Sequence, residues 1–128
     1  MVTALVDTSV LVEHEGAPRG RSDLPDEWAI SAATLAELYL GVLQASTQAE
    51  RSARLRTLAA VERRADPLPF DHNVARTFAE IVAEARSRGR KPRAMDAIIA
   101  ATAIRYELPL YTYDRDFSAF AGLTVLQP

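Results

Sequence analysis

The chain has 128 residues, of which 48% are hydrophobic and 25% are charged, with a net charge of -2. This length and composition predict a single globular domain spanning residues 1–128. The sequence contains no cysteine, which excludes disulfide scaffolds, zinc ribbons, thiol catalysis and iron–sulfur clusters. No apolar run is long enough for a transmembrane helix, and the N-terminus lacks the basic start of a signal peptide. We therefore expect a cytoplasmic protein without membrane contact.

Short apolar runs open the chain and are separated by helical and loop segments. Residues 2–6 are predicted to form a buried strand that stops at Asp7, and a helix is predicted over residues 8–13. The Gly, Pro and charged residues of segment 15–26 indicate a loop. A second short strand is predicted over residues 28–30.

Two helices are predicted next, over residues 32–45 and 47–64. Each has an apolar stripe that we expect to be buried, and the second also has arginines that we expect to face outward. The stripe residues are Leu35, Leu38, Tyr39 and Val42 in the first helix and Leu55, Leu58 and Val61 in the second, and the arginines are Arg51, Arg54, Arg63 and Arg64.

The second half of the chain continues the alternation of strands and helices. The predicted elements are an edge strand over 67–70, helices over 71–88 and 93–106, and strands over 110–112 and 123–126. Asp71 is expected to cap the first of these helices, and Gly89 is expected to end it. The alternation predicts an α/β fold with a mostly parallel sheet and helices on both faces.

Acidic residues follow two of the predicted strands. Asp7 comes directly after the first strand, and Asp114 and Asp116 come shortly after strand 110–112. In open α/β sheets, ligands bind beyond the carboxyl ends of strands, so Asp7 and Asp114 meet there if their strands flank the point where the strand order reverses. An acid after a strand can equally be a loop residue or a helix cap, and that interpretation stays open for each of them.

Two further acids lie on predicted helices. Asp96 shares an apolar stripe with Ile99 and Ala103, where a carboxylate is costly unless it is paired, capped or bound to a metal. The alternative is an acid in the first turn that complements the helix dipole. Glu37 lies nearly opposite the apolar stripe of its helix, and Thr34 and Glu37 together fit a capping box. Its position alone therefore favours a solvated or capping role.

A cluster of carboxylates needs positive charge, because the acids repel one another strongly when they are brought together. Hard divalent cations such as Mg²⁺ and Mn²⁺ prefer oxygen ligands and supply that charge. A site of this kind suits phosphodiester hydrolysis, since the metal activates water and stabilises the leaving oxygen. The sequence has no Ser–His–Asp arrangement, Walker loop or GxGxxG motif that supports a different chemistry.

Four segments of the chain resemble the PIN-domain family, and specifically the VapC-type toxin ribonucleases of type II toxin–antitoxin pairs. These segments are, in order, VDTSVL, TLAELYLGV, MDAIIAATA and LYTYDRDF. The resemblance implies a three-layer α/β/α fold whose parallel sheet has about five strands in the order 3-2-1-4-5. It also implies a Mg²⁺- or Mn²⁺-dependent endoribonuclease that leaves 5′-phosphate and 3′-hydroxyl ends and arrests translation or growth. The implied partners are a cognate VapB-type antitoxin and a second copy of the chain in a homodimer.

The resemblance assigns roles to individual residues. Asp7, Glu37, Asp96 and Asp114 are expected to hold the metal and act in catalysis, with Asp116 as an optional fifth acid. The hydroxyl residues expected to orient these acids are Thr8, Ser9 and Thr112. RNA must be held by positive charge around an acidic site, and the candidates are Arg88, Arg90, Lys91, Arg93 and Arg115. The first four of these cations lie in a basic loop, RSRGRKPR over residues 86–93, which can equally be a solvated helix end that is favoured by the helix dipole.

Two other classes of function share single features with this sequence. A phosphatase of the haloacid dehalogenase type also has an Asp after its first strand, but it needs a second acid two residues later, where this chain has Ser9. A non-catalytic binding module with the same fold has no use for converging carboxylates. The sequence therefore favours the ribonuclease.

Overall fold

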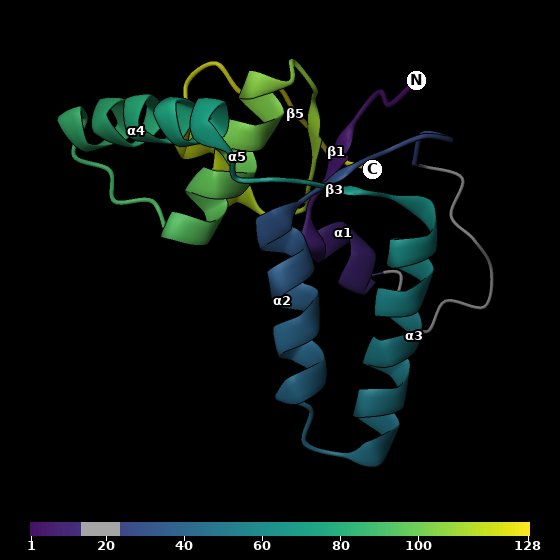
Figure 1. The fold of residues 1–128 in the computed structure, drawn as a ribbon. Helices are drawn as coiled ribbons and strands as arrows, with labels where there is room; N and C mark the ends of the chain where they lie inside the picture. Colours follow the sequence, from purple (N-terminus) through teal and green to yellow (C-terminus); the bar gives the residue numbers. More distant parts are fainter. Residues whose placement is uncertain (14–23) are drawn as a thin grey trace.

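The structure is a computed structural model that describes residues 1–13 and 24–128 (Figure 1). Most of the predicted loop over residues 15–26 lies outside these residues. The described elements, in chain order, are β1 (Leu5–Val6), α1 (Thr8–Glu13), β2 (Ile30–Ser31), α2 (Ala32–Leu43), α3 (Gln48–Arg64), β3 (Pro67–Leu68), α4 (His72–Ser87), α5 (Ala94–Arg105), β4 (Leu110–Tyr111), the 3₁₀ helix η1 (Arg115–Ala119) and β5 (Val125–Leu126).

The predicted helices and strands are all present, although each strand is shorter than its apolar run. The helix η1 is an element that apolar periodicity does not predict. It begins after Asp114, whose Oδ1 accepts a hydrogen bond from the backbone N–H of Asp116 at 2.8 Å. An Asp that bonds the amide two residues later is a local turn signal, so the Asp-Arg-Asp sequence itself favours this turn.

All strand pairs in the described residues are parallel, as predicted. One sheet has the order β1-β4-β5, and a second sheet pairs β2 with β3. An isolated bridge between Leu5 and Ala29 joins the two sheets, with the Val6 N–H donating to the Ala29 carbonyl at 2.9 Å. The expected order 3-2-1-4-5 is therefore followed only across this bridge, and the five strands do not form one continuous ladder.

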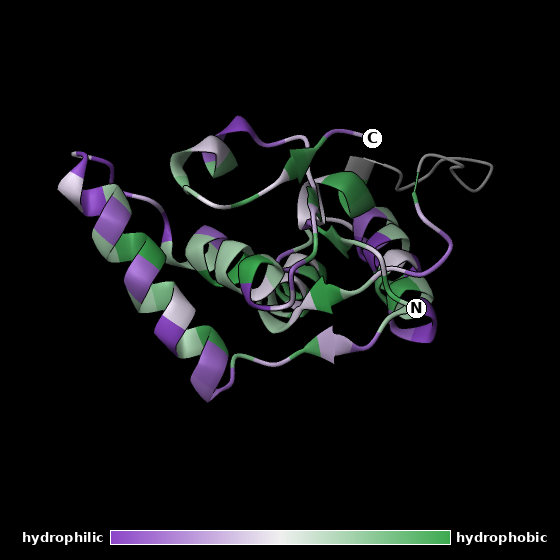
Figure 2. Cartoon of the chain, turned by 90° about the horizontal axis from the view of Figure 1, so that it is seen from above, coloured by the Kyte–Doolittle hydropathy of each residue, from purple (hydrophilic) through white to green (hydrophobic). Residues whose placement is uncertain are grey.

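The strands send alternate side chains to two different cores. Leu5 and its register partner Leu110 pack into a cluster with α4 and α5, whereas Val6 and Tyr111 pack into a cluster with α1, α2 and α3. Because successive residues of a strand point to opposite faces, this division places helices on both sides of the strands. Figure 2 shows hydrophobic residues on the strands, and hydrophilic residues along much of α4, at the left edge of that view. The arrangement is the predicted three-layer α/β/α fold.

Helix caps explain where two of the helices begin and end. Asp71 caps α4, with its Oδ1 accepting from the Val74 N–H at 2.9 Å, and Gly89 has a positive φ of 78° just beyond the helix, as predicted. The predicted capping box at Thr34 and Glu37 is wrong. The cap of α2 is Ser31, whose hydroxyl accepts from the backbone N–H of the second helical residue at 2.9 Å.

Three of the predictions for α2 and α3 need correction. Tyr39 and Leu55 are exposed rather than buried, at 45% and 47%. Tyr39 lies at the edge of the α2–α3 contact, where its hydroxyl donates to Glu62 at 2.9 Å. Arg54 does not simply face outward, because its Nη1 donates to the backbone carbonyl of Gly41 at 2.7 Å. Arg51 is exposed, as predicted.

No helix within residues 1–13 and 24–128 has both the length and the apolar character needed to cross a membrane.

Thr34 is a buried residue whose hydroxyl is unpaired. It is 0% exposed, and its Oγ1 has no hydrogen-bond partner within the described part of the chain. Because an unsatisfied buried hydroxyl is costly, we expect Thr34→Val to raise the free energy of unfolding by about 1 kcal/mol in urea denaturation. Thr102→Val is the matched control: Thr102 is also 0% exposed, but its Oγ1 donates to the Ile98 carbonyl at 2.7 Å. Stabilisation by both substitutions to the same extent would contradict this explanation.

Candidate active site

Asp7 is a buried carboxylate at the carboxyl end of β1. It occupies the junction between the end of β1 at Val6 and the start of α1 at Thr8, and only 5% of it is exposed. Its Oδ2 accepts hydrogen bonds from the hydroxyls of Ser9 and Thr112, at 2.9 and 2.8 Å. Buried carboxylates are tolerated when their oxygens are bonded in this way, so the two hydroxyls explain how Asp7 is accommodated here.

The same two hydroxyls connect the residues that follow β1 with those that follow β4. Ser9 Oγ accepts from the Tyr113 backbone N–H and Thr112 Oγ1 accepts from the Asp114 backbone N–H, both at 3.0 Å. Both hydroxyls therefore contact Asp7 and the segment that carries Asp114 at once. These contacts support the predicted role of Ser9 and Thr112 in orienting the acids.

Glu37 reaches the same end of the strands from α2. Thr8 Oγ1 donates to Glu37 Oε1 at 2.6 Å. Burial raises the pKa of Glu37, the bond from Thr8 opposes this shift, and the negative charges of Asp7 and Asp96 add to it. Helix periodicity alone predicts a solvated Glu37, and that interpretation is wrong because α1 packs against α2 and partly covers this side chain.

Asp96 lies in the first turn of α5 and forms an ion pair with Arg93. Asp96 is 5% exposed, and the Nε and Nη2 atoms of Arg93 donate to its Oδ2 and Oδ1 at 3.0 and 3.1 Å. The same guanidinium lies 3.5 Å from Asp114 Oδ2. Burial raises the pKa of Asp96, Arg93 lowers it, and the charges of Asp114 and Asp7 raise it. The contact with Arg93 is the site feature that we did not predict, although its i,i+3 spacing is a recognisable signal.

Three of the predicted acids come especially close together. Asp96, Asp114 and Asp116 each offer a carboxylate oxygen within 4.8 Å of the others. Asp7 and Glu37 lie outside this group, near enough for their charges to act on Asp96 or on each other. The structure therefore brings all five predicted acids to one end of the strands, and it places the optional acid Asp116 among the closest three.

The closest three acids fit a hard divalent cation. Oxygen ligands of one octahedral Mg²⁺ lie about 3 Å apart when adjacent and about 4.2 Å apart when opposite, so carboxylate oxygens within 4.8 Å of one another need only a small approach to share an ion. The set also attracts positive charge in the structure itself, since the Arg93 guanidinium contacts both Asp96 and Asp114. Carboxylate oxygens without histidine or cysteine favour Mg²⁺ or Mn²⁺ over softer metals.

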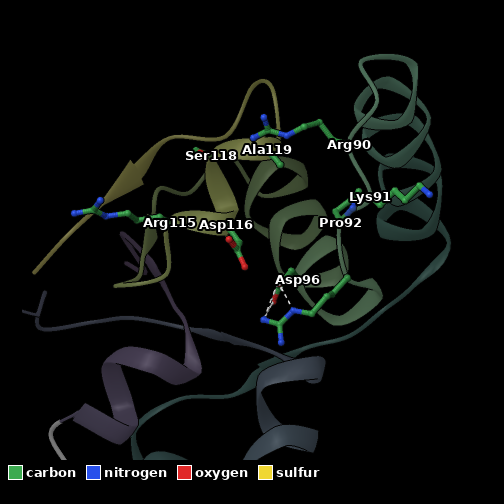
Figure 3. A pocket seen from close by; sticks show the side chains of 9 residues that line it. Arg90, Lys91, Pro92, Asp96, Arg115, Asp116, Ser118 and Ala119 are labelled. Atoms are coloured by element: carbon green, nitrogen blue, oxygen red, sulfur yellow. Dashed lines mark hydrogen bonds and ion pairs between the residues drawn. The ribbon is translucent and has the colours of Figure 1, made fainter.

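A pocket of about 360 Å³ opens beside these acids (Figure 3). Its lining combines Asp96 and Asp116 with the cations Arg90, Lys91, Arg93 and Arg115. In Figure 3, Asp116 points toward Asp96, whereas Lys91 and Arg115 point away from the space between them. The pocket is therefore acidic at its base and has positive charge around its rim.

Arg88 differs from the other candidate cations because its guanidinium forms three hydrogen bonds within the protein. It donates to both carboxylate oxygens of Glu84, at 2.7 and 2.9 Å, and to the Ala119 carbonyl at 2.6 Å. This contact ties the end of α4 to η1, a structural role that the sequence did not predict.

Comparisons with known proteins agree with this geometry. Residues 4–123 match the PIN domain family. The chain therefore belongs to the PIN-domain family, in its VapC group. It is 40% identical to ribonuclease VapC5 of Mycobacterium tuberculosis over 92% of this chain and 87% of that protein, and 37% identical to ribonuclease VapC4 of the same organism over 96% and 95%. A crystal structure of VapBC-5 from Mycobacterium tuberculosis superposes with a TM-score of 0.86 over the whole of both chains, at 34% identity.

Removing the Thr112 hydroxyl tests the network around Asp7. In Thr112→Val the buried Asp7 carboxylate loses a donor, so we expect the free energy of unfolding to fall by about 2 kcal/mol in urea with EDTA present. Thr112→Ser keeps the hydroxyl and is expected to retain most of the stability. If Thr112→Val keeps the stability of the wild type while Thr112→Ser loses it, packing of the Thr112 methyl group is responsible and the hydroxyl network is not.

Proposed function

We propose that this protein is a metal-dependent endoribonuclease, the toxin of a toxin–antitoxin pair, built as a single PIN domain over residues 1–128. The observation that carries the proposal is the convergence of Asp96, Asp114 and Asp116 beside Asp7 and Glu37, next to a rim of positive charge. Homology to ribonucleases of the VapC group supports the same reaction. The expected products carry 5′-phosphate and 3′-hydroxyl ends, because water rather than the ribose 2′-hydroxyl attacks the phosphorus.

The acids divide the catalytic work according to their surroundings. Asp96, Asp114 and Asp116, with Asp7 behind them, would hold Mg²⁺ or Mn²⁺, which supplies Lewis-acid activation of water and of the phosphate. Ser9, Thr112 and the backbone amide of Asp116 fix the orientation of these carboxylates. Glu37 suits the role of a proton acceptor, since its raised pKa brings it closer to the neutral range in which a general base works best.

Substrate binding is assigned to the cations at the rim of the pocket. Arg90, Lys91 and Arg115 line it, and no carboxylate in the described residues forms an ion pair with them. Lys and Arg side chains around an acidic centre attract the phosphates of RNA, while the acids themselves repel them. Arg93 contacts the acids directly, and Arg88 is held by Glu84, so both are weaker candidates for direct RNA contact.

A protein partner is part of the proposal. The VapBC-5 structure that this fold resembles is a member of the VapBC family of toxin–antitoxin systems, and we propose that a VapB-type antitoxin blocks this site in the cytoplasm. The chain is also proposed to form a homodimer. The outer face of α2 supports an additional interface, because Leu40 and Leu43 are 50% and 75% exposed.

RNA cleavage is tested by mapping new RNA 5′ ends after the protein is induced in cells. Asp96→Asn removes one charge from the closest three acids, so we expect the cuts to fall at least a hundredfold, with discrete 5′-phosphate ends seen only with the wild type. The same ends in both strains would contradict a catalytic role for the acid cluster. Ends that carry a 2′,3′-cyclic phosphate on the upstream fragment would exclude attack by water.

The Arg93 contact leads to a separate prediction about the metal. The guanidinium pairs with Asp96 and Asp114, so a cation that binds these acids must compete with it. We expect Arg93→Gln to bind Mn²⁺ about tenfold more tightly in calorimetry, because loss of a charge-assisted contact of roughly 1.4 kcal/mol corresponds to that factor.

Arg90→Gln is the matched control for this experiment. It removes the same charge from the same loop, but no ion pair of Arg90 with an acid is found in the described residues. Its Mn²⁺ affinity is expected to stay close to that of the wild type. Weaker Mn²⁺ binding by Arg93→Gln would show instead that Arg93 positions Asp96 for the metal, and no Mn²⁺ binding by the wild type would favour the non-catalytic binding module.

A further inference from the structure

A second cavity, of about 300 Å³, lies between α1, α2 and α3. It shares no lining residue with the pocket of about 360 Å³ beside Asp96 and Asp116. It also reaches the acids, because Thr8 and Glu37 form part of its wall. In Figure 3, α1 and α2 lie below Asp96, while Arg90 and Ser118 of the first pocket lie above it. The two cavities therefore adjoin the same acids but are lined by different elements.

Arg54 forms the wall of this cavity on α3. Its side chain is partly buried, and Nη1 donates to the Gly41 carbonyl at 2.7 Å, which fixes the guanidinium against α2. An arginine has five N–H donors, so this single bond leaves others available. No acidic side chain within the described residues forms an ion pair with Arg54. The structure therefore contains a pre-positioned guanidinium with spare donors, next to the acid site.

The rest of the lining combines flat apolar contact with hydrogen-bonding groups. Val12 and Leu38 provide aliphatic surface, and Gln44, at the end of α2, provides an amide that both donates and accepts. Unstacked RNA bases are recognised by this combination, in which an arginine plane or apolar side chain contacts the ring and amide or guanidinium groups read its edge. A phosphate alone would gain nothing from the aliphatic wall and would be repelled by Glu37.

We propose that this cavity, which we call the Arg54 pocket, binds the base of a nucleotide adjacent to the scissile phosphate and so contributes to the choice of cleavage site. The proposal rests on the proposed ribonuclease function, since it assigns a specificity site to the same reaction. Arg54 and Gln44 read the edge of the base, and Val12 and Leu38 contact its ring.

The test is cleavage of a randomised single-stranded RNA library in the presence of Mn²⁺, with the cut ends sequenced. We expect Arg54→Ala to reduce the base preference at one position beside the cut by at least about fivefold, because a good arginine contact to a base edge contributes discrimination of that order or more. Arg54→Lys keeps the charge but loses the planar fork of the guanidinium. It is expected to lose the same base preference, and to raise KM less than Arg54→Ala does. Arg51→Ala, an exposed arginine on the same helix, is the matched control and is expected to leave the profile unchanged.

Two results would overturn the Arg54 pocket without affecting the proposed ribonuclease function. They are a wild-type profile for Arg54→Ala, or a wild type that cuts with no base preference; the cavity would then be available to a peptide of a protein partner instead. If Arg54→Ala does not fold because it lacks the hydrogen bond to Gly41, Gln44→Ala tests the base preference at the same position beside the cut.

A second readout separates this proposal from the proposed function. If the wild type leaves the library uncut, the ribonuclease proposal fails, and binding is then tested by photo-crosslinking of 4-thiouridine-containing RNA to the Asp96→Asn variant. Crosslinks to peptides within residues 8–12 or 37–54, which line the cavity, support the Arg54 pocket, and crosslinks confined to other segments overturn it.

Discussion

Repulsion among carboxylates is the constraint on which the active-site end of this structure depends. Five acids lie at the carboxyl ends of the strands, and three of them offer oxygens within 4.8 Å of one another. Such a cluster is unstable unless hydrogen-bond donors and positive charge surround it. The chain meets this need with the hydroxyls of Ser9 and Thr112 around Asp7, and with the guanidinium of Arg93 between Asp96 and Asp114. Packing elsewhere fixes the elements that hold these groups.

The two-sided core explains how strands of only two residues can hold the site. Leu5 and Val6 are both fully buried but pack against different helical layers, so β1 cannot shift by one residue without reversing both contacts. The position of Asp7, one residue beyond Val6, is therefore fixed by apolar packing rather than by a long hydrogen-bonded ladder. The same reasoning applies to β4, where Leu110 and Tyr111 divide between the two cores and Thr112 follows directly.

Most of the elements and acids can be predicted from the sequence because they have a local signal. A buried apolar run followed by an acid marks the end of a strand, and Asp96 on an apolar stripe is costly without a partner. Only the family resemblance groups Glu37 with the other acids, since helix periodicity does not show that α1 covers that side of α2. The strands form two sheets that are joined by a single bridge between Leu5 and Ala29. This arrangement also lacks a local signal, because it depends on how two distant segments of the chain approach each other.

Arginine illustrates most clearly what composition leaves undecided. The chain has fourteen arginines and one lysine, a bias that the sequence alone does not convert into function. Three of them have different contacts in the structure. Arg88 links α4 to η1 through the Ala119 carbonyl, and Arg93 pairs with the acid cluster. Arg54 is bonded to α2 through one N–H group, which leaves its other donors available. The guanidinium is the same in each case, and what differs is how many of its donors the protein already uses. An arginine with most of its donors bonded within the protein has few left for RNA, so counting unused donors separates binding candidates from structural ones better than net charge does.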